Sequence, residues 1–223
     1  MFADRRDAGR QLAHRLAALA LVDPIVLALP RGGVPVAIEV AAALHAPLDL
    51  LLVRKIGAPD QPELAVAAVT DGLERIVIND ETFFASGATR DYVEREAQAQ
   101  RREIARRRDA WLHGRAPLPV QGRTAVVVDD GIATGTTLRA ALDALRQRQP
   151  ARVIVAVPVA PREEAAALRA EGHELVCLHE PTPFHAVGAH YADFEQLTDT
   201  DVTAALATIA PGPSPGSRAT RHA

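Results

Sequence analysis

Residues 125–138 combine a short apolar run, two adjacent acids and a loop of small and hydroxyl-bearing residues, in the order Ala125-Val126-Val127-Val128-Asp129-Asp130-Gly131-Ile132-Ala133-Thr134-Gly135-Thr136-Thr137-Leu138. Such an apolar run is typical of a parallel strand that helices cover on both faces. Ligands of open α/β sheets bind at the carboxyl ends of strands, and a helix N-terminus favours a phosphate because its first N–H groups lack partners. The stretch therefore predicts an α/β sheet with a phosphate-bearing ligand at the end of this strand.

The acids and the threonines together narrow the chemistry of that ligand. Two carboxylates beside a phosphate would repel it, unless the ligand also presents hydroxyl groups or Mg²⁺ accompanies it. Helix capping explains one threonine, but three threonines surround Gly135, whose missing side chain lets the backbone approach an anion. The stretch has neither the lysine of a Walker A loop nor the G-x-G-x-x-G spacing. A sugar that carries a diol and a phosphate fits these residues best.

Apolar runs and helical patterns alternate along most of the chain. The expected strands are residues 25–29, 48–53, 125–128 and 153–157, with a weaker one at 174–178, and the expected helices are residues 8–20, 34–44, 136–148 and 162–170. Strands that alternate with helices in this way predict a doubly wound parallel α/β sheet. We expect one domain over residues 1–210 and a disordered tail over residues 211–223, which are rich in Pro, Gly and Ser.

Two segments interrupt this alternation. The first, residues 56–80, holds a loop and two strand-like runs around the hairpin signal Asp71-Gly72, which indicates an antiparallel excursion from the sheet. The second, residues 89–112, is a long polar helix whose charges are typical of a solvated face. The alternative for this helix is a nucleic-acid contact through Arg106–Arg108.

The composition is that of a globular chain and draws attention to one residue. The 223 residues carry a formal net charge of −3, and the one cysteine, Cys177, excludes an intramolecular disulfide and a cysteine zinc cluster. Neither a signal peptide nor a membrane span is apparent, so we expect a cytoplasmic protein. Of 25 Lys and Arg residues only Lys55 is a lysine, and a codon bias toward arginine does not explain why this one remains.

Two further strand ends carry cations. Arg31-Gly32-Gly33 follows the first expected strand, and glycine amides beside a guanidinium suit an anion. Arg54-Lys55 follows the second, where adjacent cations are costly near a core unless something negative neutralises them. The alternatives are a solvated arginine in a glycine-rich connection and a pair of surface cations. Together with the threonine-rich loop, these segments predict three anion sites along one edge of the sheet.

The stretch from Val126 to Asp130, followed by Ala133–Thr137, resembles the phosphoribosyl pyrophosphate (PRPP) motif of type I phosphoribosyltransferases. The resemblance extends from about residue 25 to about residue 195. Leu29–Ala37 and Val53–Gly57 are similar to an uncharacterised bacterial group of predicted phosphoribosyltransferases, and Arg54-Lys55-Ile56-Gly57 resembles an element of adenine phosphoribosyltransferases. Two positions depart from the family pattern. Thr136 stands where Gly or Lys is usual, and Ala133 stands where the 6-oxopurine enzymes have an aspartate, which argues against a hypoxanthine-guanine enzyme.

The resemblance implies a role for each of these segments. The ribose hydroxyls and Mg²⁺ would lie on Asp129 and Asp130, and the 5′-phosphate on Ala133, Thr134, Gly135, Thr136 and Thr137. The pyrophosphate would lie on Arg31, Gly32, Gly33, Arg54 and Lys55, of which Arg54 and Lys55 are also expected to be catalytic.

Two further segments are expected to close over the site. Residues 57–72 would form a flexible lid that excludes water, in which Glu63 or Asp71 acts on the proton of the acceptor. Residues 1–20 and 179–210 would form a small hood, in which Phe184 or Tyr191 stacks on a flat acceptor. Alternatively, these rings form the core of the hood. The spacing of His179, His185 and His190 matches no standard zinc site, and Cys177 fits inert packing.

These features predict a Mg²⁺-dependent enzyme that transfers 5-phosphoribosyl from PRPP to a nitrogen acceptor, expected to be a nucleobase, and releases pyrophosphate. Such an enzyme would act in nucleotide salvage and, by the habit of the family, form a homodimer. The alternative is a PRPP- or nucleotide-sensing regulator on the same fold that contacts nucleic acid, because a fold alone does not decide function. Hydrolysis of PRPP would need a water-positioning base, which the sequence does not identify.

Overall fold

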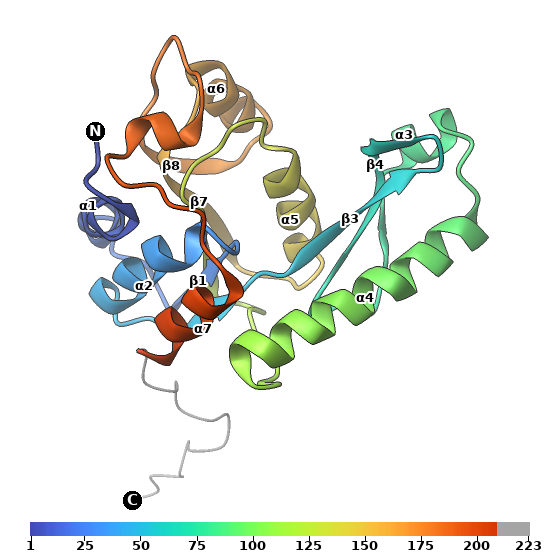
Figure 1. Ribbon diagram of the computed structural model, residues 1–223, viewed down its shortest axis with the longest axis horizontal. Helices are drawn as coiled ribbons and strands as arrows, with labels where there is room; N and C mark the ends of the chain where they lie inside the picture. The colour runs from blue at the N-terminus through green and yellow to red at the C-terminus, as the bar shows by residue number, and fades with distance from the viewer. Residues whose placement is uncertain (209–223) are drawn as a thin grey trace, which may run out of the picture.

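Five parallel strands form the central sheet of the computed structural model, which describes residues 1–208 (Figure 1). In their spatial order they are β2 (Leu48–Leu50), β1 (Pro24–Ala28), β6 (Thr124–Val128), β7 (Arg152–Val159) and β8 (Glu174–His179). Neighbouring strands pair in parallel, as where Ala28 lies opposite Val128. The predicted parallel α/β sheet is confirmed, whereas the predicted tail, residues 211–223, lies outside the described residues.

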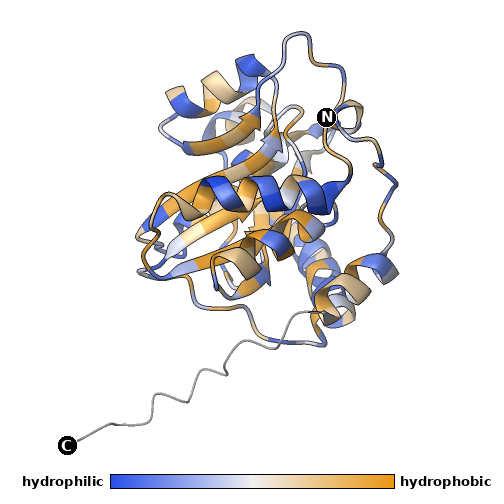
Figure 2. Cartoon of the chain, turned by 90° about the vertical axis from the view of Figure 1, so that its left-hand side faces the viewer, coloured by the Kyte–Doolittle hydropathy of each residue, from blue (hydrophilic) through white to orange (hydrophobic). Residues whose placement is uncertain are grey.

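Helices cover both faces of this sheet. One face carries α1 (Arg5–Ala17), α2 (Gly33–Ala43) and α7 (Asp199–Ala207), and the other carries α5 (Thr136–Arg146) and α6 (Arg162–Ala170). Successive side chains of a strand point to opposite faces, so Val26 and Val126 pack toward α2 while Ile25 and Val127 pack toward α5. Figure 2 shows the apolar strands enclosed by helices whose outer faces are polar. Within residues 1–208, no helix has the length and apolar character needed to cross a membrane.

Residues 53–112 form an arm that projects from one side of the central sheet (Figure 1). The arm contains an antiparallel sheet of β3 (Val53–Ala58), β4 (Gln61–Thr70) and β5 (Val77–Ile78), followed by α3 (Asp80–Ala85) and α4 (Arg90–Leu112). Buried side chains of the small sheet, among them Ile56 and Val69, share one apolar cluster with Val93 and Ile104 of α4. The predicted antiparallel excursion is confirmed. Most of the segment predicted as a lid is the strand β4.

The predicted strand over residues 48–53 is wrong in its second half. β2 ends at Leu50, and Val53 already belongs to the arm, where it lies opposite Thr70 of β4. The apolar run from Leu50 to Val53 continues past the end of β2 because the chain stays buried while it leaves one sheet for the other. Hydrophobicity alone therefore does not mark the point at which the strand ends.

A buried ion-pair network holds the base of the arm to the central sheet. Arg108 of α4 lies 2.9 Å from Asp49 of β2 and also pairs with Asp71, which accepts a 3.1 Å hydrogen bond from Leu52 N. Burial raises the pKa of Asp71, and the positive charge of Arg108 opposes that rise. Arg108 is only 7% exposed, so it does not belong to an exposed basic cluster with its neighbours in the helix.

The N-terminus of the chain meets residues 190–193 on one side of the central sheet. Phe2 N donates to His190 O at 2.8 Å, and the Phe2 ring packs beside Tyr191 in a small cluster of its own. A short 3₁₀ helix, η1 (Val187–His190), precedes Tyr191. α1, predicted as part of the hood, packs on α2 in the main core. It begins earlier than predicted because the Asp4 side chain caps its first turn, accepting from Asp7 N.

Candidate functional site

The loops that follow β1 and β6 lie against each other at the carboxyl edge of the sheet. Residues 30–33, the glycine loop, meet Asp129 and Asp130, the acid pair, because β1 and β6 are neighbouring parallel strands. A Cβ atom at Gly32 would overlap the Asp130 carboxylate. Only a residue without a side chain lets these two segments approach so closely. The predicted anion segment after β1 therefore lies beside the predicted acid pair.

The acid pair is half-buried, and the two acids are in direct contact. Asp130 N donates to Asp129 Oδ1 at 2.9 Å. Burial raises the pKa of Asp129, and the neighbouring charge of Asp130 raises it further. Arg5 Nε lies 2.8 Å from Asp130 Oδ2, and although burial raises the pKa of Asp130, this guanidinium opposes the rise. Two carboxylates in such surroundings suit a ligand that brings hydroxyl groups or a cation.

Residues 133–137, the threonine loop, lead from β6 into α5. Gly135 is the N-cap of α5 with a φ of +66°, and the threonines on either side of it, Thr134 and Thr136, are exposed. A side chain at position 135 would be strained by this φ and would overlap the Glu164 carboxylate. Arg139 supports the loop, donating to Thr134 O at 3.2 Å and pairing with Glu164 at 2.5 Å. The loop thus presents an accessible helix N-terminus flanked by hydroxyls, which suits a phosphate.

The side chain of Arg31 contacts the segment that precedes α7. Its Nη1 donates to Leu197 O at 3.0 Å, and its Nε lies 3.0 Å from Asp199 Oδ1. Both side chains of this ion pair are about two-fifths exposed, at 38% and 42%. Arg31 is therefore at the predicted edge of the sheet, but in this structure its guanidinium faces a protein carboxylate.

A small cavity joins the glycine loop, the acid pair and the base of the arm. Its volume is about 70 Å³, and its lining includes Pro30, Asp129, Thr137, Arg54 and Arg107. Arg54 also donates from Nε to the side chain of Gln100 in α4 at 2.8 Å. The structure thus brings Arg54 to the acid pair. It also brings Arg107 there, which sequence reasoning placed only within the charged run of the long helix.

Lys55 lies on the other side of β3 from Arg54. Val53 packs with the apolar cluster beside α5, whereas Ile56 packs toward α4. Because strand side chains alternate, Lys55 shares the side of Val53, and Arg54 shares the side of Ile56. Lys55 does not line the cavity described above. The two adjacent cations therefore diverge, and only one of them is brought to the acid pair.

The two acids considered for proton transfer are far apart in the arm. Glu63 is exposed and lies near the hairpin turn, where Ala58 pairs with Gln61, at the opposite end of the hairpin from Val53. Asp71 is buried in the ion-pair network at the base. Neither carboxylate lines the cavity beside the acid pair.

The two rings considered for acceptor stacking differ in their surroundings. Tyr191 is buried, its hydroxyl donates to Asp130 O at 2.5 Å, and its ring packs between those of Phe2 and Phe194. Burial raises the pKa of the Tyr191 hydroxyl. Phe184 is half-buried and stacks on His190 with the ring centroids 5.5 Å apart. Tyr191 thus holds the backbone of Asp130, while the partly buried Phe184 ring lies at the edge of the apolar cluster that contains Phe2 and Tyr191.

Arg5 is a site residue that sequence reasoning missed. It is the first residue of α1, and neither its type nor its spacing distinguishes it from Arg6 or Arg10. Only the fold reveals its place, because α1 starts beside the end of β6. No signal in the sequence would have found it.

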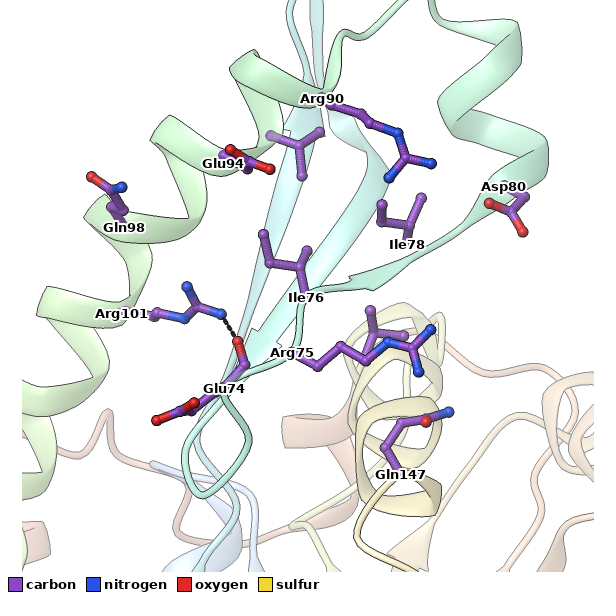
Figure 3. Close-up of a pocket in the computed structure, with 12 residues that line it drawn as sticks. Glu74, Arg75, Ile76, Ile78, Asp80, Arg90, Glu94, Gln98, Arg101 and Gln147 are labelled. Atoms are coloured by element: carbon purple, nitrogen blue, oxygen red, sulfur yellow. Dashed lines mark hydrogen bonds between the residues drawn. The ribbon is translucent and has the colours of Figure 1, made fainter.

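A wider groove of about 640 Å³ lies in the arm, away from these loops (Figure 3). Isoleucines 76 and 78 lie in its interior, and the side chains of Arg75 and Arg90 reach into it (Figure 3). Arg101 of α4 closes one end by donating to the backbone oxygen of Glu74. None of the residues assigned above to PRPP lines this groove.

A family model and two relatives of this chain carry the description phosphoribosyl transferase. A family model described as phosphoribosyl transferase domain matches residues 6–193, a span that includes all three anion segments but stops short of Arg5 and Phe194. Two Mycobacterium tuberculosis proteins, from strains CDC 1551 / Oshkosh and H37Rv and both named "Putative phosphoribosyl transferase", are 48% identical over 210 residues. These residues are 92% of this chain and 46% of each relative, so the chain spans about half the length of these relatives.

The similarity extends to a solved structure. The crystal structure of TT1426 from Thermus thermophilus matches with a TM-score of 0.84 at 47% sequence identity. The match covers 92% of this chain and 97% of that chain. Nearly the whole of that protein thus has a counterpart here.

Proposed function

The chain belongs to the phosphoribosyl transferase domain family, and from that premise we propose that it transfers a 5-phosphoribosyl group from PRPP to a nitrogen acceptor, expected to be a nucleobase. The observation that carries this proposal is the close approach of Gly32 to Asp130. It puts an anion loop and an acid pair within reach of one small molecule. PRPP carries its pyrophosphate and its ribose hydroxyls on the same ring.

In this proposal each segment of the edge takes one part of PRPP. The ribose hydroxyls lie on Asp129 and Asp130, and the 5′-phosphate lies on the threonine loop, where an accessible helix N-terminus offers N–H groups. The pyrophosphate lies on the glycine loop with Arg31 and Arg54, whose cavity reaches Asp129. Lys55, on the opposite side of β3, is the less direct pyrophosphate ligand.

Mg²⁺ fits the acid pair as an ion that arrives with the ligand. Within residues 1–208, no three His, Cys, Asp or Glu side chains are grouped so as to hold a metal by themselves. Mg²⁺ commonly binds through one or two carboxylates, with substrate oxygens and water completing its shell. Asp129 and Asp130 would hold it, and its charge would neutralise part of the pyrophosphate.

The chemistry requires little from the protein beyond position and charge. A bond forms between C1′ and the acceptor nitrogen as the bond from C1′ to the pyrophosphate oxygen breaks, and the bonding electrons leave with pyrophosphate. Arg31 and Arg54 would stabilise the negative charge on this leaving group. Glu63, expected to take the proton of the acceptor, would reach the site only if the arm closes over it.

The position of Glu63 also favours a second candidate function. A PRPP- or nucleotide-sensing protein needs the anion segments but no base, and Glu63 lies at the outer end of the hairpin. The predicted homodimer and the place in nucleotide salvage belong to the transferase proposal.

Calorimetry with PRPP and Mg²⁺, followed by a screen of nucleobases for pyrophosphate release, tests both candidates. We expect PRPP binding that is at least about tenfold weaker in Asp129→Asn and Asp130→Asn. Binding without pyrophosphate release from any base would favour the sensor, and absence of PRPP binding would remove both candidates.

A further inference from the structure

Arg5 connects three parts of the chain that are distant in sequence. Its Nε lies 2.8 Å from Asp130 Oδ2, its Nη1 donates to Glu195 O at 2.9 Å, and its Cζ lies 3.8 Å from the centroid of the Phe194 ring. The side chain is only 11% exposed. A guanidinium with this many partners is held in one orientation, since each contact restricts a different part of the fork.

We propose that Arg5 is a positioning residue, which orients the Asp130 carboxylate for the ribose and ties it to residues 191–195, the cover segment, on the side where the acceptor is expected. This inference rests on the proposed function for the identity of the ligand. It adds two residues, Arg5 and Phe194, that lie outside the span matched by the family model. It also adds a coupling between the acid pair, which binds the ribose, and the cover segment, where the acceptor is expected.

The hydrogen bonds of Asp130 support the orienting role. Arg5 donates to Oδ2 at 2.8 Å and leaves Oδ1 to face other partners. A carboxylate fixed through one oxygen presents the other in a constant direction, which lowers the entropic cost of binding a hydroxyl. The positive charge of Arg5 also offsets the acid pair, which would otherwise repel the phosphates of the ligand.

The contacts of Phe194 support the coupling. Its ring lies against Arg5 on one side and 4.9 Å from the Tyr191 ring on another, and Tyr191 donates its hydroxyl to the Asp130 backbone. A Cβ atom at Gly188 would also meet the Phe194 ring, so this packing is close. Asp130 is therefore held at its side chain by Arg5 and at its backbone by Tyr191, and both supports contact Phe194.

The test compares Arg5→Gln and Arg5→Lys with Arg6→Gln. Arg6 lies in the same helical turn, is more than half exposed and makes only a 3.7 Å contact with Glu39. For Arg5→Gln we expect PRPP binding in the presence of Mg²⁺ to weaken by at least about tenfold. Arg5→Lys should recover part of this loss because it keeps the charge, and Arg6→Gln should bind as the wild type does.

Two further readouts separate positioning from a general loss of structure. Hydrogen exchange of the cover segment without ligand should be faster in Arg5→Gln but unchanged in Arg6→Gln. Phe194→Leu, which keeps both Asp130 and Arg5 but removes the ring that contacts Arg5 and Tyr191, should also make this exchange faster. If Arg5→Gln does not fold, these measurements on Phe194→Leu and Arg5→Lys decide the question.

The outcomes are distinct. Wild-type protein that binds no PRPP would remove the proposed function and this inference together. PRPP binding of equal strength in the wild type and a folded Arg5→Gln would remove this inference alone. Unchanged exchange of the cover segment in Arg5→Gln would contradict the coupling.

Discussion

Arg31 Nε lies 3.0 Å from Asp199 Oδ1, the carboxylate of the first residue of α7. The guanidinium that we expect to bind pyrophosphate is therefore already paired with a carboxylate of the protein. A second contact, from Arg31 Nη1 to Leu197 O, fixes the same side chain to the segment before the helix. A ligand anion at this loop therefore competes with a carboxylate of the protein itself.

Replacing Asp199 by Asn should tighten the binding of pyrophosphate, because it removes the competing negative charge. The gain should be no more than about fivefold, since exposed ion pairs contribute little. Calorimetry with inorganic pyrophosphate measures it. Glu195→Gln removes the same charge from the nearby cover segment, whose residue 195 is not among the contacts of Arg31. An equal gain in that control would attribute the effect to net charge alone.

Replacing Gly32 by Ala should damage the site more than the fold. A methyl group would push the glycine loop away from Asp130, and overpacking of this kind costs about 1–3 kcal/mol of stability. PRPP affinity should fall as well. Gly87→Ala is the control, because position 87 has a φ of +67° with open space around it. That variant should lose stability but keep its affinity, and unchanged PRPP affinity in Gly32→Ala would contradict the proposed role of the contact.

Replacing Lys55 by Arg should lower turnover or PRPP affinity by about tenfold or more. A compact ammonium and a planar guanidinium present different donors, so the exchange is not neutral where an anion is bound. Steady-state kinetics measures the effect, or calorimetry where no turnover is found. The reverse exchange at an exposed ion pair, Arg152→Lys opposite Glu174, should have no effect. Full activity of Lys55→Arg would contradict a functional role for Lys55 and would mean that this lysine remains by chance.

Replacing Arg108 by Met should be strongly destabilising. The change leaves Asp49 and Asp71 buried without their shared cation, and breaking a buried pair typically costs about 3–5 kcal/mol. Denaturant unfolding followed by circular dichroism measures this loss. The exposed Arg106 provides the matched control, since Arg106→Met removes a solvated surface ion pair and should leave the stability nearly unchanged. A similar loss of stability in the two variants would show that the buried network stabilises the fold no more than an exposed ion pair does.

Cys177 should react slowly with iodoacetamide in the folded protein. Burial raises the pKa of this thiol to about 11, from a usual value of 9.0, so the thiolate fraction at pH 8 falls about a hundredfold. Because it is the chain's one cysteine, mass spectrometry follows its alkylation directly. Unfolding in urea should restore the ordinary rate. Equal rates in the two states would show that the thiol is accessible in the fold.

Much of the central sheet could be predicted, since the central strands β1, β6 and β7 are mostly continuous apolar runs. α6 begins and ends at the predicted residues, and the run before Asp129 is a strand one residue longer than predicted. The end of β2 could not be predicted, because the apolar run passes unbroken from one sheet into the next. The helices α3 and α7 were missed. α3 has only six residues, too few turns for a clear periodic signal, and α7, although as long as α6, buries only Val202 and so lacks an apolar stripe.

The candidate site likewise contains residues that could be predicted from the sequence and residues that could not. The acid pair, the glycine loop and the threonine loop each carry a local pattern, so each could be proposed from its own residues. Arg5 and Arg107 carry none, because they reach the site only through the packing of α1 and α4. The burial of Arg108 was equally hidden, since three consecutive arginines in a polar helix are typical of a solvated face. Long-range packing, which a local pattern does not encode, decides the place of all three.

The pairing of β1 with β6 also bears on how the chain folds. Val26 lies opposite Val126, so this pairing closes a loop of about 100 residues that contains the whole arm. Closing a long loop costs entropy before its contacts are gained, which makes such pairings slow to form. The two halves of the site come together only when that loop closes. A ligand bound there would slow unfolding and leave the early steps of folding unchanged.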